Sequence, residues 1–148
     1  MTAAPDLGAQ RPTATRDTRQ AVVALCVLDG LLMVASGLIH LHLWNIAYRH
    51  VTTGHLNVLF LIQTIAAFVG AIALVALRRP IVVAGSAALM IGTIVGFLLA
   101  RYRPAGLFGF KLPYSTSDAK WALAVEIAAA ILLSITAGTM ARAGHARS

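Results

Sequence analysis

The sequence predicts an all-α, polytopic membrane protein, built as a bundle of four transmembrane helices. Hydrophobic residues make up 59% of the 148-residue chain and charged residues only 11%, far below the roughly 25% charged residues of soluble domains. The mean hydropathy is +0.81. The apolar residues gather in four runs, at about 21–44, 56–77, 81–100 and 122–140, and each run approaches the roughly 20 residues that span a bilayer.

The first run begins after Arg19, because residues 1–19 are rich in Thr, Ala, Pro and Arg and show no apolar period. This composition predicts a flexible tail before the first span. The second run carries no charged residue and ends at Arg78-Arg79-Pro80, where two cations and a proline end the helix.

The third run ends at Arg101-Tyr102-Arg103-Pro104, and the fourth run is followed by a short tail, residues 142–148. Residues 20–141 therefore form a single membrane domain with a tail at each end. The lone cysteine, Cys26, lies within an apolar run and cannot form a disulfide within the chain.

The distribution of basic residues predicts which side of the membrane the termini occupy. Four spans place both termini on one side, and cytoplasmic segments carry an excess of Lys and Arg. With cytoplasmic termini, seven basic residues would lie on the inner side: Arg11, Arg16, Arg19, Arg78, Arg79, Arg142 and Arg147. Five would lie on the outer side: Arg49, Arg101, Arg103, Lys111 and Lys120. We therefore expect a multi-pass protein of the plasma (inner) membrane with both termini in the cytoplasm.

Polar residues within the spans are the candidate site, because ionisable groups at membrane depth are costly and mark function. They are Asp29 and His40 in the first span, Gln63 in the second and Glu126 in the fourth. At 100° per residue, each lies on the face that carries the small or polar residues of its span. At about 1.5 Å per residue, His40, Gln63 and Glu126 lie roughly 6–10 Å below the outer end. We expect these three residues to be neighbours.

Three further residues complete the expected polar cluster. His55 and Arg101 follow the outer ends of spans and should lie above His40, Gln63 and Glu126. Asp29 lies roughly 22 Å from the outer end at about 1.5 Å per residue. Its expected partner is Arg78 or Arg79, near the cytoplasmic side.

Small residues predict close packing of the helices. The third span carries Ala88, Gly92, Gly96 and Ala100, each four apart, and similar stripes are Ala130, Ser134 and Gly138 in the fourth span and Ala66 and Gly70 in the second. Such stripes let helix backbones approach one another. We expect a compact bundle, with the third-span stripe facing its interior or a second copy.

Several functions are compatible with the polar residues. They could form a hydrogen-bonded network that fixes helix register, an ion-coupled or small-ligand site, or a metal or haem site. Haem would need His40 and His55 to face each other, and a metal could use His40, His50, His55 and Glu126, but no spacing here is diagnostic of a cofactor. The chain contains no Gly-x-Ser-x-Gly, His-Glu-x-x-His or phosphate-loop motif, so nothing indicates a hydrolase.

Three segments form a series along the chain: Gly37-Leu-Ile-His-Leu-His-Leu-Trp44, Tyr48-Arg49, and Gly54-His-Leu-Asn-Val-Leu-Phe-Leu-Ile-Gln63. Together with Leu107-Phe-Gly-Phe110 and a later membrane glutamate, Glu126, this series resembles a pattern in small four-span membrane proteins of high-GC actinobacteria. The resemblance covers most of residues 21–140. It implies the four-span topology and the choice of His40, Gln63 and Glu126, and it implies no mechanism, since that family has no assigned function.

The sequence thus predicts a non-catalytic accessory or scaffolding membrane subunit with a polar cluster in the outer leaflet. The alternatives are a small ion- or proton-coupled transporter using Glu126, and a haem- or metal-binding redox protein using His40 and His55. The expected partners are the lipid bilayer, and other membrane subunits or a second copy. The net charge of +7 suits anionic lipid head groups rather than nucleic acid.

Overall fold

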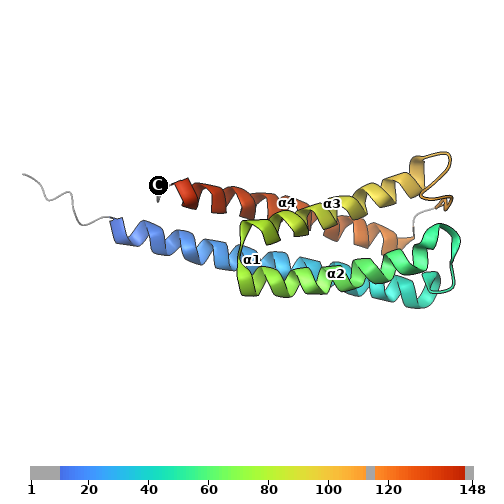
Figure 1. Cartoon of the computed structure of the whole chain (residues 1–148), viewed down its shortest axis with the longest axis horizontal. Helices are drawn as coiled ribbons and strands as arrows, with labels where there is room; N and C mark the ends of the chain where they lie inside the picture. The colour runs from blue at the N-terminus through green and yellow to red at the C-terminus, as the bar shows by residue number, and fades with distance from the viewer. Residues whose placement is uncertain (1–10, 113–115, 146–148) are drawn as a thin grey trace, which may run out of the picture.

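The structure is a computed structural model that describes residues 11–112 and 116–145. Four long helices run up and down: α1 (Arg11–Leu43), α2 (Leu56–Leu77), α3 (Pro80–Tyr102) and α4 (Ser117–His145) (Figure 1). A π-helical turn, η1 (Trp44–Tyr48), and a 3-10 turn, η2 (Thr53–His55), lie between α1 and α2. All four long helices are long and apolar enough to cross a membrane, so the all-α four-span prediction is confirmed.

The bounds of α2 match the predicted span, whereas α1 and α4 are longer than predicted. Residues 11–19 and 142–145 were expected in tails, but they continue α1 and α4. Extending an existing helix needs no new nucleus, and Pro12 falls in the first turn, where proline is tolerated. The rest of the expected tails, residues 1–10 and 146–148, lies outside the described residues.

The two ends of the bundle differ. The turn end holds the Arg78–Arg79 turn, the start of α1 and the end of α4; the loop end holds the longer connections after α1 and after α3 (Figure 1). At the turn end Arg78 adopts a left-handed conformation (φ 48°) and Pro80 begins α3. Proline suits this first helical position because its fixed φ is already helical.

The helices form a ring in which α1 packs against α2 and α4, while α3 packs mainly against α4. Residues buried along α1 and α4 recur at alternating spacings of three and four: Cys26, Asp29, Met33, Ser36, His40 and Leu43 on α1, and Ala122, Glu126, Ala129, Leu133 and Thr136 on α4. A period of 3.5 is the pattern of left-handed, near-antiparallel helix packing.

The hydrophobic core is densely packed toward the turn end. Met33, Leu74, Val83, Met90 and Leu133 are fully buried there. The helices α1 and α2 approach closely because α1 carries glycines one heptad apart that face α2. A β-carbon at Gly30 would lie 3.4 Å from the Ala71 carbonyl oxygen, and one at Gly37 would lie 3.3 Å from the Ala67 β-carbon.

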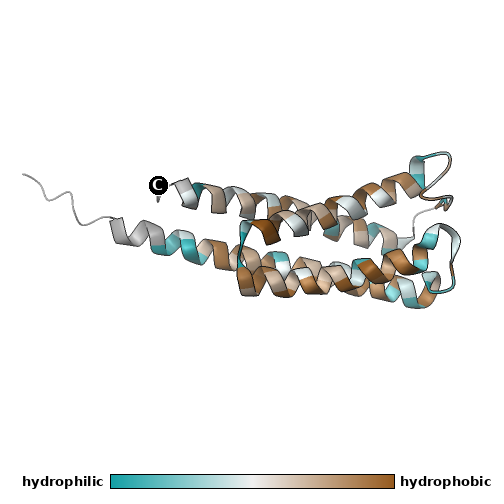
Figure 2. Cartoon of the chain, viewed as in Figure 1, coloured by the Kyte–Doolittle hydropathy of each residue, from teal (hydrophilic) through white to brown (hydrophobic). Residues whose placement is uncertain are grey.

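The outer surface of the helices is apolar, and hydrophilic residues concentrate toward the ends of the bundle (Figure 2). Large side chains such as Leu31, Val69, Ile72 and Ile131 point outward. The hydroxyls of Ser134 and Thr139 donate to the carbonyl four residues earlier, 2.8 and 2.9 Å away, so these hydroxyl protons are satisfied without water. This surface is suited to contact with the hydrocarbon core of a bilayer.

Candidate functional site: a cavity at the loop end

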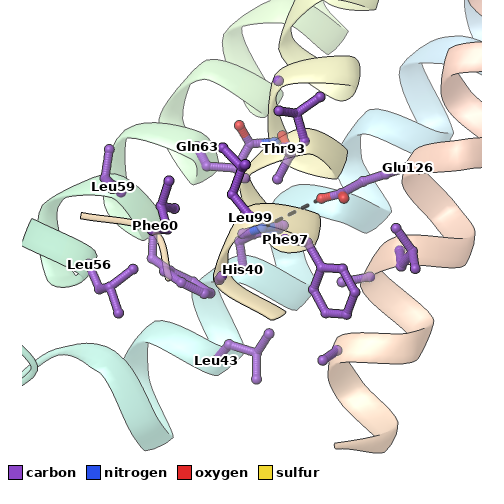
Figure 3. A pocket seen from close by; sticks show the side chains of 18 of the residues that line it. His40, Leu43, Leu56, Leu59, Phe60, Gln63, Thr93, Phe97, Leu99 and Glu126 are labelled. Carbon is purple, nitrogen blue, oxygen red and sulfur yellow. Dashed lines mark ion pairs between the residues drawn. The ribbon is translucent and has the colours of Figure 1, made fainter. Parts of the chain in front are cut away.

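A cavity of about 500 Å³ lies between the helices toward the loop end. Its walls come from all four helices and from the segment that follows α3. Most of the lining is apolar, and His40, Gln63, Thr93 and Glu126 supply its polar groups within the helices (Figure 3). Ligand sites of proteins commonly have about 300–1,000 Å³ and an apolar lining with a few placed polar groups.

The small-residue stripe of α3 creates much of this space. Ala88, Gly92, Gly96 and Ala100 all line the cavity, and a β-carbon at Gly92 would have no atom within 4 Å. The stripe therefore faces the cavity. It was expected to let a neighbouring helix pack closely against α3. The corresponding stripe of α4 faces outward at Ser134 and Gly138, which are exposed.

His40 and Glu126 form the polar contact at the base of the cavity. The Nε2 atom of His40 lies 3.5 Å from Oε1 of Glu126, and the Ser36 hydroxyl is also 3.5 Å from that oxygen. The Nδ1 atom of His40 lies 2.9 Å from the Ser36 carbonyl oxygen. Distances of 3.5 Å are at the outer limit for hydrogen bonds, so the Glu126 carboxyl group is held loosely.

This geometry allows His40 and Glu126 to share one proton. A carbonyl oxygen only accepts, so Nδ1 of His40 must carry a hydrogen and donate it to Ser36. The hydrogen between Nε2 and Oε1 then belongs either to the imidazole or to the carboxyl group. The pair is neutral overall in both cases, which suits a site away from water.

Gln63 reaches the same cavity from α2. Its side chain is buried, and its Nε2 atom has no hydrogen-bond partner. An unpaired buried donor costs about 1–3 kcal/mol. The amide therefore offers an N–H group to any acceptor that occupies the cavity.

His40, Gln63 and Glu126 come from three helices, and all three line the same cavity (Figure 3). The other expected members of the cluster lie elsewhere. His55 is exposed at the start of α2 with a left-handed φ of 55°. The Arg101 guanidinium lies 5.4 Å from the centre of the Tyr102 ring. Neither is among the described residues that line the cavity.

Asp29 lies nearer the turn end and has a different partner from the one expected. The Thr136 hydroxyl donates to Oδ2 of Asp29 over 2.6 Å, while the second carboxyl oxygen has no partner. Arg78 instead donates from Nε to the Val75 carbonyl oxygen, 2.9 Å away. The expected ion pair with an arginine is thus replaced by a hydrogen bond across the α1–α4 contact, because Asp29 faces the bundle axis and the arginines are exposed.

An aromatic group above His40 was not foreseen from the sequence. The Phe60 ring centre lies 5.2 Å from that of His40 and 4.3 Å from that of Tyr48, and Phe110 meets the Tyr48 ring edge-on at 6.1 Å. These residues come from three separate segments. One signal could have indicated the contact, namely that Tyr48 and Phe110 flank spans at the same end.

His40 and His55 do not form the facing pair that a haem needs. Both ring nitrogens of His40 are occupied by Ser36 and Glu126, and His55 is exposed. Within residues 16–112 and 116–144, no group of three or more His, Cys, Asp or Glu side chains is placed to hold a metal ion.

Comparisons with protein-family models, with curated protein sequences and with solved structures find no match for this chain. No family is therefore assigned to this chain.

Proposed function

We propose that this integral membrane protein binds a small, mostly apolar molecule in the loop-end cavity through His40, Gln63 and Glu126. The observation that carries the proposal is a cavity of about 500 Å³ that contains both an unpartnered amide donor and a loosely held carboxyl group. A bound acceptor would remove the cost of the unpaired donor, and the apolar walls would bury the rest of the molecule.

The accessory-subunit interpretation accounts for less of the site. It expects polar groups that satisfy one another in a closed core. The Asp29–Thr136 contact fits that description in part, since one carboxyl oxygen is bonded at 2.6 Å. The unpartnered Gln63 amide and the open volume beside it support binding instead. Contacts with other membrane subunits or with a second copy remain proposals for the outward helix faces.

The orientation in the membrane also remains a proposal. The start of α1 and the end of α4 lie at the turn end (Figure 1), and this end carries the exposed residues Arg16, Arg19, Arg78, Arg79 and Arg142. This concentration of positive charge supports cytoplasmic placement of the turn end in a plasma membrane. The cavity would then lie in the outer half of the bilayer.

Photolabelling with benzophenone, a lipid-soluble ketone, tests the binding proposal. Protein in phosphatidylcholine nanodiscs is irradiated with increasing benzophenone, and the labelled peptides are identified by mass spectrometry. We expect saturable labelling at cavity-lining residues such as Leu89 and Leu123. Gly96→Phe, which places a ring in the cavity, should strongly reduce it, and Gly138→Phe, at an open position on α4, should not. Labelling that does not saturate, or that is equal in both variants, would refute the proposal.

Proton-coupled carriage is the second candidate, because the proton shared by His40 and Glu126 sits at the cavity wall. An acceptor that hydrogen-bonds to the protonated Glu126 carboxyl group would free Nε2 of His40 to take up one further proton from water. We expect benzophenone binding in the dark to change the pH of a weakly buffered sample, and Glu126→Gln to remove the change while labelling persists. A parent protein that binds benzophenone without proton release or uptake would rule out coupling at this pair.

A further inference from the structure

We propose that the molecule bound in the cavity is a lipid-soluble compound with a neutral hydrogen-bond acceptor, such as a carbonyl, and that it enters from the bilayer between α2 and α3. This inference rests on the proposed function and adds the route and the chemical class.

The rim between α2 and α3 is open to the surroundings of the bundle. Ile62 of α2 is 55% exposed and Val95 of α3 is 46% exposed, yet both line the cavity. Ala88 and Gly92 of α3 are also exposed lining residues. The two helices share the tight turn at Arg78–Arg79, and α3 leads away from α2 toward the loop end (Figure 1). The opening therefore lies on the side of the bundle, within the apolar spans.

The loop end of the cavity is covered by the segment Leu107–Phe110. Leu107 and Phe110 exchange two backbone hydrogen bonds of 2.8 Å, and the Leu112 N–H donates to the Ala100 carbonyl oxygen over 2.9 Å. This closed turn lies against the α1–α2 connection, because a β-carbon at Gly54 would be only 3.1 Å from the carbonyl oxygens of Leu107 and Phe108. Direct entry from water would require this contact to separate.

The lining indicates what occupies the space. An apolar cavity at membrane depth offers water too few partners, so hydrocarbon from the bilayer is its natural content. The unpartnered Gln63 amide requires an acceptor. An anionic head would meet the Glu126 carboxyl group without a compensating cation, because no Arg or Lys is among the described lining residues. A neutral acceptor on a hydrocarbon body satisfies all three conditions.

The entry route is tested by placing bulk at the rim. Ile62→Trp and Val95→Trp add bulk at positions already exposed to lipid, and Leu61→Trp and Ile91→Trp are matched controls on the same helices that do not line the cavity. We expect the rim variants to slow benzophenone labelling of Leu123 by about tenfold, which corresponds to an increase of about 1.4 kcal/mol in the free-energy barrier to entry. The control variants should be labelled at the rate of the parent protein. Equal rates in rim and control variants would refute lateral entry.

The chemical class is tested by competition for the same labelling site. We expect 2-tridecanone, a neutral ketone, to compete at least about fivefold better than tridecane, the same body without an acceptor, since one hydrogen bond gives roughly this ratio. Gln63→Leu should remove the difference. Stronger competition by dodecanoate or dodecylamine would show that the site prefers a charged head and overturn the inference. If benzophenone fails to label the parent saturably, the proposed function fails; if labelling saturates but these comparisons fail, only the route or class is wrong.

Discussion

The contact between His40 and Glu126 gives a quantitative prediction. Two opposite charges 3.5 Å apart would attract by about 5 kcal/mol at an effective dielectric constant of about 20. Removing both groups from water offsets most of this attraction. Measured couplings between polar side chains in membrane proteins average about 0.6 kcal/mol and reach about 1.7 kcal/mol. The shared proton places this pair in the upper part of that range, and the long distance keeps it below the maximum.

We therefore expect a coupling free energy of about 1 kcal/mol in a double-mutant cycle. The variants are His40→Gln, Glu126→Gln and the double substitution, which retain polar side chains and limit new cavities. The free energy of unfolding is measured for each by titration with SDS in dodecyl maltoside micelles, followed by circular dichroism.

Thr136→Val combined with His40→Gln serves as the control cycle. Thr136 lies ten residues beyond Glu126 on α4, about 15 Å along the helix axis, so the two changes should be additive within about 0.5 kcal/mol. A coupling in the His40–Glu126 cycle no larger than that of the control would refute the interaction and the shared proton inferred from it.

Two further predictions concern stability. Thr136→Val should lower the free energy of unfolding by about 1–3 kcal/mol, because it leaves the buried carboxyl group of Asp29 without its 2.6 Å hydrogen bond. The control is Thr139→Val, which should change that free energy by less than about 0.5 kcal/mol, because the Thr139 hydroxyl bonds only to its own helix. Equal losses for the two variants in the same SDS titration would contradict the Asp29–Thr136 hydrogen bond. Gly37→Leu should cost about 1–3 kcal/mol, since a β-carbon there would already lie 3.3 Å from the nearest side chain of α2. Gly138→Leu, with no atom within 4 Å of its β-carbon, should be neutral or stabilising because leucine favours helix; a Gly37 variant as stable as its Gly138 counterpart would argue against close α1–α2 packing.

The difference between a 3.6 and a 3.5 period decides which residues of α4 share the buried face of Glu126. At 100° per residue, Ala137 shares the face of Glu126, and Thr136 is turned away by 80°. The structure buries Thr136 fully and leaves Ala137 exposed. In a supercoiled bundle the buried residues recur every 3.5 residues. The buried face therefore moves around an ideal helix of 3.6 residues per turn by about 20° per heptad.

The sequence by itself determined the four spans and the depth of their polar groups. Apolar runs of about 20 residues form helices in a bilayer, since backbone groups find no other partners there. The helix α2 covers Leu56–Leu77, the same range as the second apolar run. The fixed rise per residue also places His40 and Glu126 at similar depth.

Only the tertiary structure decided how those groups are used. The pairing of Asp29 with Thr136 and the aromatic group around Tyr48 join segments far apart in the chain, and no local pattern specifies such contacts. The cavity is the clearest case, because the stripe that contains Gly92 and Gly96 could equally have held a helix against α3. Small residues produce close contact or open space according to how near the neighbouring helix lies. For α3, that separation depends on the angle at which the helix leaves the Arg78–Arg79 turn.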